Sequence, residues 1–230
     1  MLPLIQSGKD LTPYIDHTVL KPGLLLNQVK TACMEAIDNG FAAVCVPPLF
    51  VKTAASFCLS TKVKVATVIG FPFGYCAVEA KIAETLLAMV DGADELDVVI
   101  NYTALKNGDY VFLANEINHL MHIIKSKNKT IKVIIESGIL TDEEIIRCCD
   151  IYGAAGVDFV KTSTGYAEKG ATLEAVKLIR LHLAASIGIK ASGGIRTYEF
   201  AKALVEAGAT RIGCSSSLQI IAEQQAKGNY

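Results

Sequence analysis

Short apolar segments that alternate with stretches of helical length dominate the sequence and limit the folds open to it. Runs rich in Val and Ile predict eight strands, at 15–20, 42–47, 63–69, 95–101, 131–136, 157–162, 187–191 and 210–214. Amphipathic or alanine-rich stretches between them predict helices, for example at 77–91, 110–127, 171–185 and 197–207. Eight strand–helix units favour an α/β fold that closes into a single (β/α)8 TIM barrel.

Local signals for helix ends agree with this division. Gly40, Gly92 and Gly208 stand where a helix commonly ends in glycine. Thr141–Glu144 has the form of a capping box, which predicts a helix start between the fifth and sixth strands. An open doubly wound sheet is the alternative, but the sequence contains no G-x-G tripeptide and so lacks the dinucleotide-binding fingerprint. We expect one barrel domain over residues 1–230, with a short N-terminal helical extension.

Charge and composition exclude several functional classes. The chain has 22 Lys+Arg against 23 Asp+Glu, so it has no general basic surface for nucleic acid or anionic lipid. Glycine and proline interrupt the longest uncharged stretch, 65–78, which excludes a membrane-spanning helix there. The first residues lack the pattern of a signal peptide, and the seven cysteines form no C-x-x-C motif. We therefore expect a cytoplasmic protein with a small-molecule substrate and no nucleic-acid or membrane partner.

Three charged residues stand inside predicted strands. Asp97 opens the apolar run of the fourth strand, and Lys161 and Lys190 lie near the ends of the sixth and seventh strands. Parallel strands are covered on both faces, so a charge within one requires a reason. Period-two alternation allows all three side chains to point into the same cavity of a barrel. The alternative for each is a strand-end charge whose stem packs while its head reaches water.

Two lysines at close range give this cluster a definite chemistry. Ammonium groups about 5 Å apart repel by roughly 3 kcal/mol at an effective dielectric near 20, enough to lower one pKa by about two units. A lysine that is neutral near neutral pH attacks a carbonyl to form an imine, which accepts electrons when an adjacent carbon–carbon bond breaks or forms. A nearby aspartate can then move the protons. The sequence thus predicts an imine-forming active site.

Segments rich in Gly and Ser follow the sixth, seventh and eighth predicted strands. They are Thr164-Gly165, Ser192-Gly193-Gly194 with Arg196, and Gly213-Cys214-Ser215-Ser216-Ser217. Loops at these positions of a barrel often bind phosphate through backbone N–H groups and a helix N-terminus. Ordinary turns also favour Gly and Ser, so the position beside the two lysines is what indicates a phosphorylated carbonyl substrate.

Two residues near the site have both a functional and a structural interpretation. Asp16, just before Thr18 in the first strand, either supports a lysine or is a strand-end charge. Cys45 either lines the pocket or is a buried structural thiol.

Three further features carry less weight. His119 and His122 have no third ligand at a matching spacing, so we expect no metal. Gly165–Gly170 has the spacing of a P-loop, but Ala171 replaces the required lysine, so ATP binding is not supported. Tyr230 could reach the barrel mouth and relay a proton.

Five ordered motifs resemble the deoxyribose-phosphate aldolase family over almost the whole chain. They are Tyr14–Leu20 (YIDHTVL), Val44–Pro48 (VCVPP), Glu95–Asn101 (ELDVVIN), Val157–Gly165 (VDFVKTSTG) and Ile189–Arg196 (IKASGGIR). The resemblance implies a TIM-barrel class I aldolase of deoxyribose phosphate catabolism. Such a lyase reversibly cleaves 2-deoxy-D-ribose 5-phosphate to D-glyceraldehyde 3-phosphate and acetaldehyde, without metal or organic cofactor.

The resemblance also implies roles for individual residues. Lys161 would form the Schiff base, Lys190 would lower its pKa and assist proton transfer, and Asp97 would donate and accept protons through water. Asp16, Thr18 and Cys45 would support the pocket. The residues matching the phosphate-binding loops are Gly165, Gly193, Gly194, Gly213, Ser215 and Ser216.

Two other functions remain open from the sequence. Another class I aldolase or a transaldolase would keep the imine lysine but accept a different donor. A non-catalytic phosphate-binding barrel would form no imine. We expect a homodimer, although apolar exteriors of barrel helices occur with or without a partner.

Overall fold

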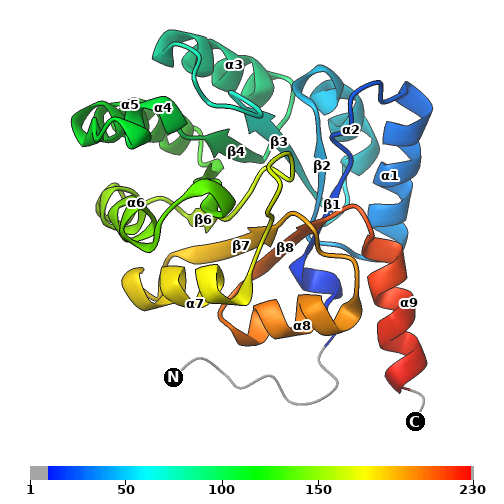
Figure 1. The fold of residues 1–230 in the computed structure, drawn as a ribbon. Helices are drawn as coiled ribbons and strands as arrows, with labels where there is room; N and C mark the ends of the chain where they lie inside the picture. The colour runs from blue at the N-terminus through cyan, green and yellow to red at the C-terminus, as the bar shows by residue number, and fades with distance from the viewer. Residues whose placement is uncertain (1–9, 229–230) are drawn as a thin grey trace.

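The computed structural model describes residues 10–228, and over this range eight parallel strands close into a barrel in chain order (Figure 1). The strands are β1 (Ile15–Thr18), β2 (Ala43–Val46), β3 (Lys64–Ile69), β4 (Glu95–Val99), β5 (Thr130–Ile134), β6 (Phe159–Lys161), β7 (Gly188–Ser192) and β8 (Arg211–Cys214). β8 pairs with β1 and completes the ring. The predicted (β/α)8 barrel is confirmed, and the closure excludes the open doubly wound sheet.

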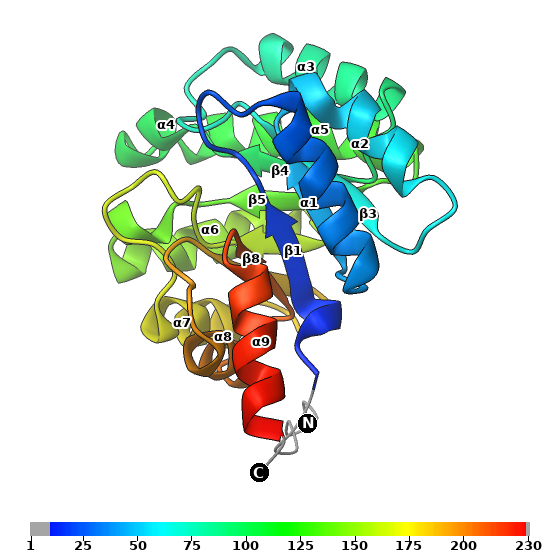
Figure 2. The ribbon, with the colours of Figure 1, turned by 90° about the vertical axis from the view of Figure 1, so that its right-hand side faces the viewer.

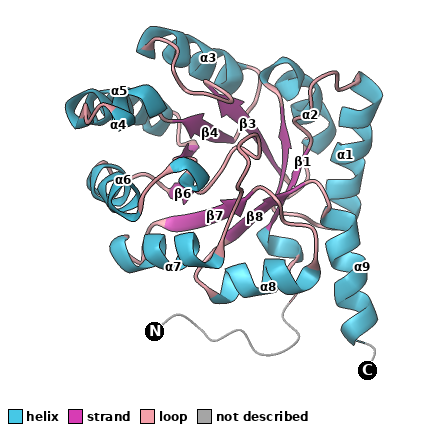
Figure 3. Ribbon diagram, viewed as in Figure 1, coloured by secondary structure: helices cyan, strands magenta, loops and turns pink. Residues whose placement is uncertain are grey.

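Helices cover the outside of the barrel (Figure 3). They are α1 (Leu26–Asp38), α2 (Val51–Cys58), α3 (Val78–Val90), α4 (Tyr102–Lys106), α5 (Tyr110–Ser126), α6 (Asp142–Ala154), α7 (Leu173–His182), α8 (Tyr198–Glu206) and α9 (Ser217–Gly228). Single 3-10 turns lie at η1 (Thr12–Tyr14), η2 (Pro48–Phe50) and η3 (Ser137–Ile139). Seen from the side, α1 and α9 flank β1 (Figure 2). In the part of the chain that the structure describes, no helix is both long and apolar enough to cross a bilayer.

The helix ends follow the sequence signals. The Thr141 N–H donates to Glu144 Oε2 at 2.8 Å, and the Glu144 N–H donates to Thr141 Oγ1 at 3.2 Å, which confirms the capping box at the start of α6. Gly40, Gly92 and Gly208 come directly after the caps of α1, α3 and α8 and have positive φ, as expected for helix ends.

The observed strand ends lie within two residues of the expected ones, and two differences are informative. The fourth strand ends at Val99 rather than at residue 101, because the Asn101 side chain accepts from the Ala104 N–H at 3.0 Å and caps α4. Ahead of β1, the described residues hold a single 3-10 turn, η1. Residues 1–9, where the rest of the expected helical extension would fall, lie outside the described residues.

Alternation along the strands divides the buried side chains into two sets. Outward residues such as Val44, Leu96 and Ile189 join the large apolar core between the strands and the helices. Inward residues on β2 and β3 form a separate small cluster, made of Ala43, Cys45, Ala66 and Val68 with Leu20 and Phe71 packed against it. The remaining strands also place charged side chains inside the barrel, and these charges make up the site described below.

An ion pair outside the barrel fixes the strand that carries Asp97. Lys81 on α3 is fully buried, and its Nζ donates to Glu116 Oε1 on α5 at 2.6 Å. The same Nζ donates to the Val99 carbonyl at the end of β4 at 2.8 Å. A buried pair of this kind is costly to break once formed, so α3, α5 and the end of β4 are held in one arrangement.

Candidate active site

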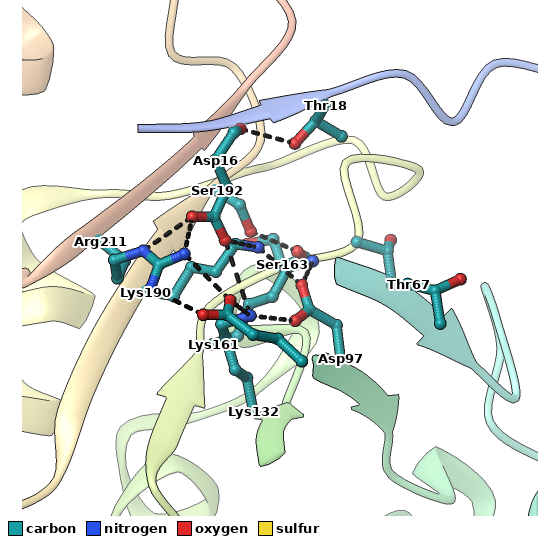
Figure 4. Close-up of polar contacts among 12 residues, drawn as sticks. Asp16, Thr18, Thr67, Asp97, Lys132, Lys161, Ser163, Lys190, Ser192 and Arg211 are labelled. Carbon is teal, nitrogen blue, oxygen red and sulfur yellow. Dashed lines mark hydrogen bonds and ion pairs between the residues drawn. The ribbon is translucent and has the colours of Figure 1, made fainter. Parts of the chain in front are cut away.

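Asp97 lies at the centre of a buried network of charges (Figure 4). The side chain is fully buried, and its Oδ1 accepts from Lys132 Nζ at 2.8 Å. Its Oδ2 accepts from both Lys161 Nζ and Lys190 Nζ, each at 2.7 Å. The structure therefore brings together the three strand charges singled out in the sequence and adds Lys132.

Strand register explains why these side chains meet. In the β4–β5 pair Asp97 lies beside Lys132, and in the β6–β7 pair Lys161 lies beside Lys190. β5 and β6 are themselves neighbours, so four consecutive strands supply the group. Because side chains alternate between the faces of a strand, a matching register is enough to direct all four into the barrel.

A second set of ion pairs extends the network to β1 and β8. Asp16 on β1 lies 2.5 Å from Lys190 Nζ through Oδ2, and its Oδ1 accepts from Arg211 Nε at 2.7 Å. Glu95 on β4 binds Lys132 Nζ at 2.6 Å and Arg211 Nη2 at 3.0 Å. Figure 4 shows Arg211 and Lys190 on opposite sides of the Asp16 carboxylate. Asp16 thus supports Lys190 directly.

The balance of charge in this network singles out one cation. As far as the described residues define it, four cationic side chains (Lys132, Lys161, Lys190 and Arg211) share three carboxylates (Asp16, Glu95 and Asp97). Full ionisation would leave one uncompensated positive charge in a buried place, which is unfavourable. One lysine should therefore be neutral.

The direction of each lysine's pKa shows which one gives up its proton most readily. Burial by itself would lower the pKa of all three amines. At Lys132 the charges of Asp97 and Glu95 outweigh burial, and the pKa is raised. At Lys190 the charges of Asp16 and Asp97 do the same. At Lys161 burial prevails over Asp97, Lys190 adds its repulsion, and the pKa is lowered. We expected lysine–lysine repulsion to be the main cause. Burial is the larger one.

The carboxylates respond in the opposite direction. Burial alone would raise the pKa of Asp97, but the charges of Lys132, Lys161 and Lys190 outweigh it and hold that pKa well below its ordinary value. Asp16 behaves in the same way, with Lys190 and Arg211 as the main opposing charges on its pKa. Both carboxyl groups are therefore ionised at neutral pH.

A cavity of about 670 Å³ opens above the network. Its walls come from the ends of four strands and the loops that follow them, at 18–24 for β1, 164–166 for β6, 192–196 for β7 and 213–215 for β8. Among the described residues, Lys161 is the one member of the charge network that lines this cavity. A carbonyl compound in the cavity would thus meet Lys161 first, with Asp97 directly behind it.

The predicted phosphate-binding glycines lie together on one side of the cavity. Gly165, Gly193 and Gly194 line it and have φ of 89°, 88° and 76°, a conformation that favours glycine. A Cβ on Gly193 would lie only 3.0 Å from the Cα of Gly170, so the loops after β6 and β7 touch backbone to backbone. Arg196 adds a cationic side chain to the same wall.

Of the predicted phosphate-binding residues at the end of β8 and in the loop after it, some line the cavity and one does not. Gly213 and Ser215 line the cavity, whereas Ser216 does not, and its carbonyl accepts from the Ile220 N–H in the first turn of α9. A Cβ on Gly213 would come within 2.9 Å of Lys190 Cε. Gly213 therefore also leaves room for the lysine side chain that crosses it.

A histidine fixes the start of α9 behind this loop. Ser217 Oγ lies 2.9 Å from His17 Nδ1, and His17 Nε2 lies 2.8 Å from Glu35 Oε2 on α1. Burial lowers the pKa of His17, although Glu35 opposes the shift. In the neutral ring the carboxylate requires the proton on Nε2, so Nδ1 accepts from Ser217.

The other predicted residues have simpler positions. Thr18 lines the cavity, and its Oγ1 donates to the Asp16 carbonyl at 2.9 Å. Cys45 is fully buried in the small apolar cluster, where burial raises the pKa of its thiol. Tyr230 lies outside the described residues. Within residues 10–228, no three His, Cys, Asp or Glu side chains are grouped as a metal site would require.

Sequence reasoning missed Lys132, Glu95 and Arg211. Each is a charge inside a predicted strand, the same signal that identified Asp97 and the two other lysines. Applying that criterion to every strand, rather than to the most apolar ones, would have found them.

A barrel with a buried, carboxylate-bound lysine at the base of its cavity, of lowered pKa, belongs to the aldolases that work through a lysine imine. Comparison with known proteins agrees with this class. The family model described as DeoC/LacD family aldolase matches residues 11–223, and the chain belongs to that family.

Individual relatives match over nearly the full length. The chain is 45% identical over 229 residues to a deoxyribose-phosphate aldolase of Caldanaerobacter subterraneus subsp. tengcongensis, covering 99% of each chain. It is 50% identical over 216 residues to a deoxyribose-phosphate aldolase of Thermococcus gammatolerans, covering 93% of this chain and 96% of the relative. A solved structure named QR15, an aldolase, superposes with a TM-score of 0.90 at 41% identity, covering 96% of this chain and 98% of that one.

Proposed function

We propose that the protein is a class I aldolase that reversibly cleaves 2-deoxy-D-ribose 5-phosphate to D-glyceraldehyde 3-phosphate and acetaldehyde, in the breakdown of deoxyribose phosphate. The observation that carries this proposal is that Lys161 lines the cavity while Lys132, Lys190 and Asp97 lie behind it. The names and coverage of the relatives support the choice of substrate.

Lys161 begins the reaction as a neutral amine. Its Nζ attacks C1 of the open-chain sugar to form a carbinolamine, and uptake of one proton from solvent lets the hydroxyl group leave as water, which gives a protonated imine. The C3 hydroxyl then loses its proton and the C2–C3 bond breaks. C3 leaves as the aldehyde carbon of D-glyceraldehyde 3-phosphate, and the electron pair of the broken bond moves into the imine to give an enamine. Protonation at C2 and hydrolysis release acetaldehyde and restore the free amine.

Asp97 and Lys190 serve this sequence from behind Lys161. The Asp97 carboxylate touches Lys161 Nζ, which places it to accept and return protons through a water molecule. Lys190 keeps its charge because Asp16 and Asp97 both bind it, and that charge disfavours a second ammonium at Lys161. Asp16, Lys132 and the rest of the network hold these two groups in place.

The glycine-rich wall would receive the phosphate group. Gly165, Gly193, Gly194 and Ser215 bring backbone to the cavity surface, where N–H groups bind phosphate well. Arg196 adds positive charge there. Gly213 belongs to the same wall, whereas Ser216 does not line the cavity and its carbonyl accepts from the Ile220 N–H of α9.

Trapping the imine tests the function. The protein is incubated with acetaldehyde, reduced with borohydride and mapped by mass spectrometry, with an aldehyde-free sample as control, while release of acetaldehyde from 2-deoxy-D-ribose 5-phosphate is followed separately. We expect one stoichiometric adduct on Lys161 and turnover of the sugar phosphate. An adduct on Lys190 would reverse the lysine roles. The absence of both an adduct and turnover would overturn the proposed function.

The rate of adduct formation should depend on pH through Lys161. Burial lowers the pKa of Lys161, so its reactive neutral form appears as pH rises through that lowered pKa and is lost below it. We expect the trapping rate to rise with pH and level off clearly below about 10.4, the ordinary lysine pKa. The measurement is adduct yield at short times between about pH 5 and 11. A midpoint at or above the ordinary value would contradict it.

The cytoplasmic location and the homodimer expected from the sequence stay predictions. Exposed apolar residues on the outer helices, such as Leu87 and Val90 on α3, are compatible with self-association.

A further inference from the structure

A buried carboxylate beside the cavity has no part in the proposed chemistry. Glu136 follows β5 and is 3% exposed. Its backbone is left-handed, with φ 54° and ψ 57°, a conformation uncommon for residues other than glycine and asparagine. Its Oε1 is buried with no hydrogen-bond partner among the described residues. Strain and an unpaired oxygen together in one buried residue suggest that its position serves a function.

The other carboxylate oxygen of Glu136 holds the loop after β6. Oε2 accepts from the Thr164 N–H at 3.1 Å and also from Thr164 Oγ1. Thr164 Oγ1 accepts in turn from the Tyr166 N–H at 3.0 Å. A single carboxylate oxygen therefore determines the course of the chain around Gly165, the glycine with φ of 89° that faces the cavity.

The same loop then reaches across the cavity. Tyr166 Oη donates to the Leu20 carbonyl at 2.9 Å, and the Tyr166 ring meets Phe71 edge-on at 5.4 Å between ring centroids. Thr164, Tyr166 and Leu20 all line the cavity, whereas Glu136 does not. The hydrogen bonds thus run from Glu136, outside the cavity, through the loop after β6 to the loop after β1.

Backbone hydrogen bonds hold the base of this connection. The Ser137 N–H donates to the Thr162 carbonyl at 2.7 Å, which extends the pairing of β5 and β6 beyond its last strand residues. On the far side, the Ala171 N–H donates to the carbonyls of Ser192 and Gly193. Hydrogen bonds thus join the loops after β5, β6 and β7, and Glu136 contacts the middle loop through Thr164.

We propose that Glu136 is a positioning residue that shapes the Thr164–Tyr166 loop to receive the phosphate group, and so sets the preference for phosphorylated over unphosphorylated substrate. This inference rests on the proposed function. Glu136 acts through Thr164 and takes no part in imine formation. Burial raises the pKa of Glu136, and the hydrogen bonds from Thr164 oppose that shift.

Two amide substitutions distinguish the effect of the Glu136–Thr164 contact from the effect of the left-handed backbone at residue 136. Glu136→Gln keeps the length of the side chain and an oxygen that accepts from Thr164. Glu136→Asn suits the left-handed backbone better but is one methylene too short for that contact. The probes are inorganic phosphate, measured by calorimetry, and turnover of 2-deoxy-D-ribose 5-phosphate and of unphosphorylated 2-deoxy-D-ribose. Thermal unfolding of each variant reports on the fold.

Loss of the contact should weaken phosphate recognition alone. In Glu136→Asn we expect the Kd for phosphate and the KM for the sugar phosphate to rise about tenfold, with kcat and 2-deoxyribose turnover within about threefold of the unaltered protein. Glu136→Gln should stay within about threefold on phosphate binding and on turnover of both sugars. If the asparagine variant does not fold, Thr164→Val takes its place. This substitution removes the hydroxyl partner of Glu136 and should also weaken phosphate binding.

Several outcomes would overturn the assignment. They are unchanged phosphate binding in Glu136→Asn, an equal loss on both sugars, or a glutamine variant as impaired as the asparagine variant. Failure of the proposed function would be distinguishable from failure of the Glu136 assignment. The unaltered protein would then release no acetaldehyde from the sugar phosphate, and the phosphate Kd of the variants would still test Glu136.

Discussion

Replacing Lys161 with alanine should abolish turnover of 2-deoxy-D-ribose 5-phosphate, with a loss of about four powers of ten or more in kcat/KM. Lys161 supplies the nitrogen of the imine and is the member of the charge network that lines the cavity. The remaining lysines are held behind it by Asp97 and Asp16. Steady-state kinetics and borohydride trapping measure the effect, and no acetaldehyde adduct should form at any position in the site.

The fold should survive this substitution. Without Lys161, three cations and three carboxylates remain in the network, so no buried charge lacks a counterpart. Lys177→Ala on the exposed face of α7 is the matched control and should leave both activity and unfolding unchanged. Turnover by Lys161→Ala close to that of the unaltered protein would refute the mechanism.

Asp97→Asn should damage both catalysis and stability. The amide cannot accept a proton as the carboxylate does, so the rate should fall by several powers of ten, about 10³-fold or more. With Lys161 neutral, breaking the buried pairs leaves three cations facing two carboxylates, so one buried cation lacks a counterpart, which should lower the free energy of unfolding by about 3–5 kcal/mol. Steady-state kinetics and urea unfolding at neutral pH measure the two effects.

The stability loss should depend on pH in a predictable direction. Because the pKa of Asp97 is depressed in the folded protein, its contribution is present above the unfolded value of about 3.9 and is lost as pH falls through the folded pKa. The gap between the variant and the unaltered protein should therefore shrink in strong acid. The control is Asp150→Asn, which removes the exposed ion pair between Asp150 and Arg147, whose charged atoms lie 3.8 Å apart. It should lower the free energy of unfolding by at most about 1 kcal/mol. A rate within tenfold of normal would contradict the role of Asp97.

Much of this arrangement could be predicted from local pattern. Apolar runs separated by helical stretches predict all eight strands, because strand period and helix caps are local properties of the sequence. Charges within such runs point to Asp97, Lys161 and Lys190, since alternation fixes which side chains share a face.

The remainder depends on contacts between distant segments. Which lysine lines the cavity is decided by loops after β1, β6, β7 and β8, whose shapes no local pattern specifies. The left-handed backbone at Glu136 is equally invisible, because glutamate carries no turn preference of its own. The dominance of burial over lysine–lysine repulsion at Lys161 emerges only from the packed barrel.

Closure of the barrel between β1 and β8 has a consequence for synthesis of the chain. Asp16 leaves the ribosome early, yet its partner Arg211 lies 195 residues later, and Lys190 precedes that arginine by only one strand. Until β8 has emerged, the carboxylate of Asp16 cannot be paired inside a closed ring. We therefore expect a chain truncated before β8, which lacks Arg211 and the strand that closes the ring, to have no functioning site.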